Sequence, residues 1–303
     1  MSKHHLQPRV YVPAFFALVI VAGLTVYSST HKNKLKSVEV NKPALAIDTI
    51  KEEPIGELLG KASISFEGGT EERNKNIELG VSKLNGKTIL PGEEFSFIKS
   101  LGSVTEEDGY SIAKVFLNGE VTTGVGGGLC QVSTTLFQSL LKAGLPITER
   151  HNHSYTVSYY DVGIDATYSD PGVDLKFVND TGSPITIKGK TEDKEVIFEI
   201  YGTSDGRIAT TTEPIIYNVV DVPPARYVAT TTRSSSEPEC VNKPQIGYTS
   251  NVIYNVLYPN GDFKTKEFKS RYKPLQKVCY YYGVSTTTPT SFFFFFFDEE
   301  KGT

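Results

Sequence analysis

The sequence predicts an α+β fold in which short strands outnumber helices. Tyr and Phe each occur 17 times and Gly 26 times, whereas Met occurs once and Trp is absent, and this composition favours strands and turns over a helix bundle. Apolar runs of about four to eight residues recur between turn residues, as expected of short strands. One long run with helical spacing follows a glycine-rich segment and predicts a single central helix.

Length and charge limit the function classes. The 303 residues correspond to one or two domains at roughly 150 residues each. Apolar residues make up 39%, charged residues 22%, and the mean hydropathy is -0.22, which excludes a wholly disordered chain and a multi-span membrane protein. The net charge of -4 gives no electrostatic attraction to nucleic acid, so no nucleic-acid partner is expected.

The N-terminal end contains an uncharged apolar run, residues 11–27, that predicts a membrane anchor. Its length is at the lower limit for a helix that spans a bilayer, and no small-residue cleavage pattern follows it. We expect an uncleaved signal anchor, with the cytoplasmic tip and membrane helix in residues 1–30 and a polar tether in residues 31–46. A removed signal peptide is the alternative. In either case the folded body lies outside the cytoplasm.

Three cysteines support this location. Cys240 and Cys279 flank one compact segment rich in Tyr and Lys, and such a pair outside the cytoplasm predicts a disulfide. Cys130 is then unpaired. An odd cysteine in an exported protein is either a buried inert thiol or a reactive one, and its neighbours decide which.

The first folded unit, residues 47–202, begins with a short helix and strands. Apolar spacing predicts that the helix ends at Asn85-Gly86, a typical C-terminal cap. Asn118-Gly119 between two apolar runs predicts a hairpin. The elements expected here are a helix at 77–84, strands at 88–90 and 94–98, and hairpin strands at 113–117 and 120–123.

The longest predicted helix lies within the run from Gly124 to Pro146. Closely spaced glycines at its start permit positive φ or close backbone packing. Apolar residues from Val132 to Leu141 fall on one helical face, and Pro146 follows its end. Cys130 therefore lies in or just before the first turn of this helix.

The rest of the chain is predicted to be mainly β-structure. A linker rich in Thr, Ser and Pro, with room for two strands, covers residues 203–237, and a small β-module covers residues 238–283. A low-complexity tail that contains Phe292 to Phe297 covers residues 284–303. The expected strands are 147–150, 154–160, 165–168, 175–177, 184–188 and 196–201, and then a hairpin of 252–258 and 263–270.

Cys130, His153 and Asp165 are the candidate catalytic residues. A helix N-terminus stabilises a thiolate through its free N–H groups and its dipole. An imidazole on the next strand can take the thiol proton, and an acid can then fix the imidazole tautomer. The order Cys, helix, His, Asp in the chain is that of papain-like and transglutaminase-like cysteine enzymes.

Structural and ligand-binding roles compete with this interpretation. Cys130 has the helical spacing of a small core residue, and His153 and Asp165 fit hydrogen-bonded structural positions. Cys130, His151 and His153 lack a standard zinc-ligand spacing, so neither a metal nor another cofactor is expected. His151 is expected to be exposed. The candidate binding residues are Gly126, Gly127, Gly128, Gln131, His151 and Tyr155.

The sequence resembles a known family. PGEEFSF at residues 91–97 and the run at residues 109–187, with GGGLCQVSTTL, RHNHSY and GIDAT, are similar to the VanW family, named for an accessory protein of vancomycin-resistance clusters. The resemblance implies an anchored or secreted envelope protein, and no established biochemical activity comes with it. Residues 256–283 are similar to the G5-type β-module that often follows such domains, but differ in carrying a cysteine pair.

Three functions remain open at this point. The domain binds a cell-wall (peptidoglycan) component or a peptide, with the glycine loop shaping the pocket. Alternatively, Cys130 attacks an amide of peptidoglycan stem peptides or cross-links, as an amidase or a transpeptidase-type enzyme does. The third function is that of a non-catalytic envelope scaffold. In each case we expect a single-pass protein of the cell membrane, held through residues 11–27.

Overall fold

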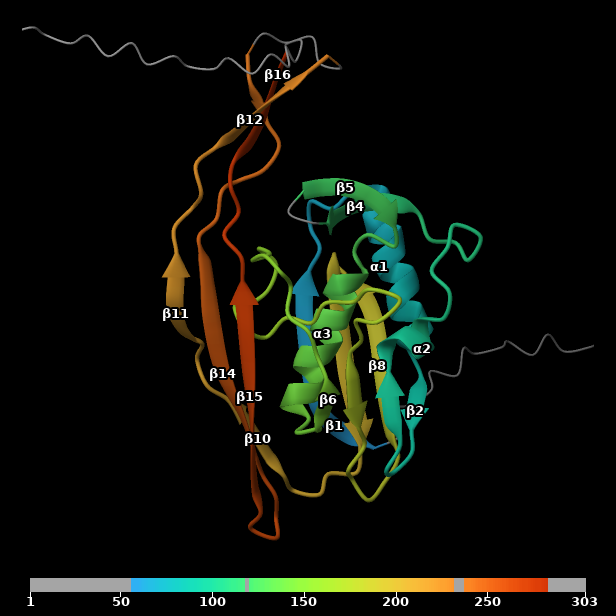
Figure 1. The fold of residues 1–303 in the computed structure, drawn as a ribbon. Helices are drawn as coiled ribbons and strands as arrows, with labels where there is room; N and C mark the ends of the chain where they lie inside the picture. The colour runs from blue at the N-terminus through green and yellow to red at the C-terminus, as the bar shows by residue number, and fades with distance from the viewer. Residues whose placement is uncertain (1–55, 118–119, 232–236, 283–303) are drawn as a thin grey trace, which may run out of the picture. The chain divides into compact units, whose positions relative to one another are not determined.

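The computed structural model describes residues 56–117, 120–231 and 237–282 (Figure 1). The expected anchor at 11–27 and the phenylalanine tract at 292–297 lie outside the described residues. Within the described part, no helix is both long enough and apolar enough to cross a membrane.

The main sheet carries the two long helices. Its strand order is β1-β9-β8-β2, with every neighbouring pair antiparallel. Helix α1 contacts β8, helix α3 contacts β1 and β9, and the two helices also contact each other (Figure 1). The predicted α+β class is therefore confirmed, and the sheet that carries the helices is antiparallel. The bounds are β1 Glu57–Ser65, α1 Glu71–Leu84, β2 Lys87–Ile89, α3 Leu129–Lys142, β8 Ile185–Glu192 and β9 Glu195–Gly202.

Smaller elements surround this layer. Strands β4 and β5 form the predicted hairpin, and a second sheet has the order β3-β7-β6. The strand predicted over 94–98 is too long, because the Ser96 side chain accepts a hydrogen bond from the Lys99 N–H and starts a short helix. The bounds are β3 Glu94–Ser96, α2 Phe97–Leu101, β4 Ile112–Leu117, β5 Glu120–Val125, β6 Ile147–Glu149 and β7 Lys176–Val178.

Helix α1 starts earlier than its apolar spacing predicts. It begins at Glu71 because Thr70 caps it, with Oγ1 accepting from the Arg73 N–H at 3.4 Å. The first turn is polar and exposed, so periodicity alone places the start at Ile77. The predicted end at Leu84 is confirmed.

Helix α3 is the centre of the core. Eleven of its fourteen residues are buried, including Leu136 and Phe137, and it ends at Lys142 as the Gly144 and Pro146 signals predict. Its polar side chains also bind a neighbouring segment. Cys130, Thr134 and Gln138, four residues apart on one helical face, hydrogen-bond the backbone of residues 168, 166 and 164.

The strands predicted at 154–160 and 165–168 are wrong. Both stretches are turns and irregular chain. Gly163 turns the backbone with φ +88°, and residues 164–168 bond to side chains of α3 instead of to a strand. Side-chain acceptors and donors thus replace the sheet ladder that the residue pattern predicts.

The C-terminal hairpin packs on α3. Strands β14 and β15 are paired as predicted, and β10 and β11 flank β14. Val252 and Phe268 join the same apolar core as α3, with Phe137 and Phe268 in edge-to-face contact at 5.3 Å. The predicted boundaries at 203 and 238 stay predictions, but the core continues across them. The bounds are β10 Ile208–Thr211, β11 Ile215–Val220, β14 Gly247–Leu257 and β15 Phe263–Tyr272.

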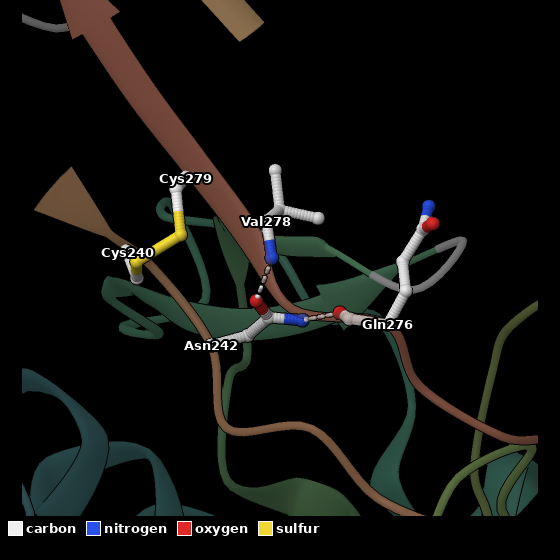
Figure 2. Close-up of a disulfide and its surroundings, with 5 residues drawn as sticks. All are labelled: Cys240, Asn242, Gln276, Val278 and Cys279. Carbon is white, nitrogen blue, oxygen red and sulfur yellow. Dashed lines mark hydrogen bonds between the residues drawn. A yellow bond between two sulfur atoms is a disulfide. The ribbon is translucent and has the colours of Figure 1, made fainter. Parts of the chain in front are cut away.

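A small third sheet has the order β12-β16-β13 and contains the predicted disulfide between Cys240 and Cys279 (Figure 2). Next to it, Asn242 donates from Nδ2 to the Gln276 carbonyl at 2.7 Å and accepts from the Val278 N–H at 2.8 Å. The side chain of Asn242 thus ties β16 to the segment after β13. The bounds are β12 Arg226–Thr230, β13 Glu239–Cys240 and β16 Val278–Tyr282.

Candidate functional site

The glycine loop delivers Cys130 to the first turn of α3. Gly128 has φ +115°, and a Cβ on it would lie 3.1 Å from Cγ of Arg73. A Cβ on Gly127 would lie 2.7 Å from the Lys114 carbonyl oxygen, and Gly126 has φ +79°. These three candidate binding residues therefore have a packing role, because only glycine lets the loop pass between α1 and β4.

Cys130 is partly exposed and lies against the irregular segment that follows His153. Its thiol donates to the Tyr168 carbonyl at 3.4 Å and accepts from the Tyr168 N–H at 3.5 Å. This pair of contacts holds the sulfur in place without a covalent partner.

His153 lies between Cys130 and Asp165, and we call these three residues the Cys–His–Asp cluster. The Nδ1 atom of His153 is 2.7 Å from Oδ2 of Asp165, and the imidazole is 14% exposed. Its buried Nε2 atom makes no hydrogen bond of normal geometry within the described residues, but the ring is near enough to Cys130 for each group to shift the other's pKa. Such bonds often tighten only when substrate is bound.

The electrostatics of the cluster favour an ion pair. Burial raises the pKa of the Cys130 thiol, but the nearby His153 imidazole and its positive charge outweigh it, so the pKa lies below its usual value. Burial lowers the pKa of His153, but Asp165 and Cys130 outweigh that effect and raise it to about 9. Both shifts act in the direction that favours a thiolate beside an imidazolium.

Asp165 orients the imidazole. Its side chain is 0% exposed, and its carboxylate accepts five hydrogen bonds, from His153 (backbone N–H and Nδ1), Tyr160, Tyr272 and Arg150. Burial raises the pKa of Asp165, but the bond from His153 and the charge of Arg150 lower it by more. The carboxylate therefore stays ionised and holds the proton of the imidazole on Nδ1.

Arg150 and Tyr272 are site residues that the sequence patterns did not identify. Arg150 donates to the Asp165 carboxylate at 2.9 Å, to the Gly163 carbonyl at 3.1 Å and to Oγ of Ser270 at 2.9 Å. Tyr272 donates to Asp165 at 2.6 Å and accepts from the Gly163 N–H at 3.0 Å. Arg150 directly precedes His151 in the chain, but no local signal links Tyr272 to the site, since it comes from β15.

The other predicted binding residues lie around the cluster without joining it. His151 is exposed and pairs with Glu149 at 3.2 Å, so only one of the two neighbouring histidines faces Asp165. Gln131 is buried and bonds to backbone and to Arg73. Tyr155 is half-buried in the loop after His153. Within the described residues, no group of three or more His, Cys, Asp or Glu could hold a metal.

The cluster thus contains a nucleophile close to a base, and the base is hydrogen-bonded to an orienting acid. A thiolate at a helix N-terminus attacks electrophilic carbon, and the imidazole can protonate a leaving group. This combination performs acyl transfer without a metal or an organic cofactor.

Comparisons with known proteins identify similar chains. Residues 72–201 match the family described as VanW like protein. Uncharacterized protein YoaR of Bacillus subtilis (strain 168) is 37% identical over 145 residues, 48% of this chain and 48% of that protein. Vancomycin B-type resistance protein VanW of Enterococcus faecalis (strain ATCC 700802 / V583) is 34% identical over 136 residues, 43% of this chain and 50% of that protein. The chain spans about half the length of the curated relatives it matches.

Proposed function

This chain carries a VanW-like domain at residues 72–201, and we propose that the domain acts on a peptidoglycan component of the cell envelope through Cys130. The name of the Enterococcus relative, a vancomycin resistance protein, supports a role at the cell wall. The disulfide between Cys240 and Cys279 supports an oxidising compartment outside the cytoplasm. In this proposal residues 11–27 anchor the chain in the membrane.

The observation that carries the proposal is a His153 imidazole that is hydrogen-bonded to a buried, ionised Asp165 and near enough to Cys130 to shift its pKa. A cysteine that only filled core space would need no imidazole beside it, and a structural histidine would need no cysteine. Here the two groups raise and lower each other's pKa in the directions that a nucleophile and its acid–base partner require. We therefore favour a cysteine-dependent amide hydrolase or acyl transferase over a binding module.

The reaction proceeds in two halves. The thiolate of Cys130 attacks an amide carbonyl carbon and forms a C–S bond, while the carbonyl electron pair moves to oxygen. When this intermediate collapses, the C–N bond breaks and His153 gives its Nε2 proton to the departing amine. Water then attacks the thioester and releases an acid, or a second amine attacks and forms a new amide. His153 takes the proton of the attacking group, and Cys130 leaves as thiolate.

The experiment uses the full chain with its disulfide oxidised and peptidoglycan-derived stem peptides as substrates. We expect mass spectrometry to detect an acyl adduct on Cys130 and the released amine. Cys130→Ser and His153→Ala should each lower turnover by about a hundredfold or more. His151→Ala is the matched control, because this exposed neighbour pairs with Glu149, and it should keep turnover near that of the parent.

Two outcomes would contradict the proposal. If the parent forms no adduct and Cys130→Ser binds the peptides as tightly as the parent, the domain is a binding module. If neither binding nor turnover is detected and both variants support normal envelope function, the chain is a scaffold.

A further inference from the structure

Arg73 is a partly buried cation without an acidic partner in the described part of the chain. It lies in the first turn of α1 and donates from Nη2 to Oε1 of Gln131 at 2.5 Å, with its guanidinium carbon 5.9 Å from the Tyr159 ring centroid. Among the described carboxylates, none lies within ion-pair distance of it. Its polar partner is therefore a neutral amide.

The two other inward-facing arginines differ from Arg73. Arg150, with 4% of its side chain exposed, pairs with Asp165, and Arg207, with 7% exposed, pairs with Asp180 and Asp205. Burial of a charge costs free energy unless an opposite charge compensates it. Among the described residues Arg73 faces no carboxylate, only the Cys130 sulfur, and this points to a carboxylate that arrives from outside the chain.

Gln131 positions the Arg73 guanidinium without neutralising it. The Nε2 atom of Gln131 donates to the Ser65 carbonyl at 2.7 Å, which leaves Oε1 directed at Arg73. A neutral acceptor fixes the side chain but leaves its positive charge, whereas a carboxylate in the same place would cancel it. Within the described residues, the remaining N–H groups of the guanidinium have no hydrogen-bond acceptor, so a further acceptor can bind them.

Arg73 is also next to the nucleophile. Gln131 directly follows Cys130 in α3, and Gly128 of the same loop packs against the stem of Arg73. Burial lowers the pKa of Arg73, while the charges of Tyr159 and Cys130 oppose that shift, so the guanidinium and the thiol are electrostatically coupled. An anion held by Arg73 would thus lie near the reacting sulfur.

We infer that Arg73 binds a carboxylate of the molecule that reacts with Cys130. The inference rests on the proposed function and names its substrate class, a peptide with a free carboxylate close to the amide that is cleaved. A guanidinium suits this task because its planar N–H groups match the two oxygens of a carboxylate. Arg73 is then a specificity-determining residue, distinct from the Cys–His–Asp cluster.

The test uses two small probes that alkylate the same sulfur. Iodoacetate carries a carboxylate and iodoacetamide does not, so the ratio of their rates at Cys130 reports the contact with a carboxylate. In the full chain with its disulfide oxidised, we expect this ratio to fall about tenfold in Arg73→Gln, the factor of one charge-assisted hydrogen bond. Arg73→Lys, which keeps the charge but loses the planar geometry, should give an intermediate ratio.

Lys75→Gln is the matched control, because Lys75 is an exposed cation on the same helix, and it should leave the ratio unchanged. A change in folding or in the thiolate fraction alters the rates of both probes equally, so it cancels in their ratio. The iodoacetamide rate of each variant, taken alone, reports that change. If Arg73→Gln keeps the parent ratio while iodoacetamide still reacts, the inference is wrong and the proposed function stands. If neither probe reacts with the folded parent, both the inference about Arg73 and the proposed function are wrong.

Discussion

The loop that holds His153 and Asp165 and the small sheet of β12, β13 and β16 are stabilised in opposite ways. The loop has irregular backbone, but Asp165 is fully buried and bound by side chains from its own segment and from β15. The small sheet has regular backbone, but within its three strands only Val278 and Cys279 are buried, and a disulfide crosses it. Regular secondary structure is thus a poor guide to where this molecule is buried and densely bonded.

The largest effect is expected from Asp165→Asn, which removes the charge at the centre of the loop. It leaves the buried guanidinium of Arg150 unpaired, and breaking a buried pair in this way costs about 3–5 kcal/mol. We expect urea unfolding at pH 7 to show this loss and the alkylation rate of Cys130 to fall with it. Asp161→Asn, an exposed acid of the same loop, should change neither.

The pH dependence of this loss provides a second check. The pKa of Asp165 is lowered in the folded protein, so its stabilisation is fully present above the unfolded value of about 3.9. It disappears as the pH falls through the lower folded pKa. The difference between parent and Asp165→Asn should therefore shrink in acid, and a difference independent of pH would contradict the ionised assignment.

A smaller effect is expected when the disulfide of the small sheet is removed. The bond joins residues 39 positions apart, and loss of such a cross-link typically costs about 2–4 kcal/mol. In Cys240→Ser with Cys279→Ser we expect faster hydrogen exchange at the amides of β12 and β16. The alkylation rate of Cys130 should match the parent. A parallel fall in that rate would show that the two regions are coupled.

The smallest effect is expected from Tyr272→Phe, which removes two hydrogen bonds between β15 and the loop, one to Asp165 and one from the Gly163 N–H. Its hydroxyl donates to Asp165 at 2.6 Å, and a hydrogen bond to a charged group contributes about 2 kcal/mol. Tyr248→Phe on the neighbouring strand is the control, because its hydroxyl contacts only the neutral Thr156 hydroxyl and should contribute about 1 kcal/mol. Equal losses in urea unfolding would contradict a special role for the Asp165 contact.

The parts of the fold that apolar periodicity determines were predictable. Helix α3, the end of α1 and the hairpins β4–β5 and β14–β15 agree with the sequence analysis, because each has a buried face and a recognisable turn or cap. The segments at 154–160 and 165–168 were not predictable as irregular chain. Their residues suit strands, and in the second segment bonding of its backbone to side chains of α3, which no local pattern records, overrides that preference.

The candidate site shows the same division. Cys130, His153 and Asp165 could be proposed from residue type and order, and the structure brings them together. Arg73 and Tyr272 could not be proposed in this way, because their proximity to the site depends on how α1 and β15 pack against the core. The role of the glycine loop in shaping a pocket stays a prediction, and the structure adds that Gly127 and Gly128 lack space for a Cβ.

The most direct test of this account is the rate at which iodoacetamide alkylates Cys130 between pH 5 and 9. The pKa of Cys130 is lowered and that of His153 is raised to about 9, so the thiolate should be present, with its imidazolium partner, well below the free-cysteine value of about 8.5. We therefore expect the midpoint of the parent's rate profile to lie below this free-cysteine value. In His153→Ala the midpoint should shift to higher pH. A thiol that reacts only after the protein unfolds, or a profile that His153→Ala leaves unchanged, would contradict the account.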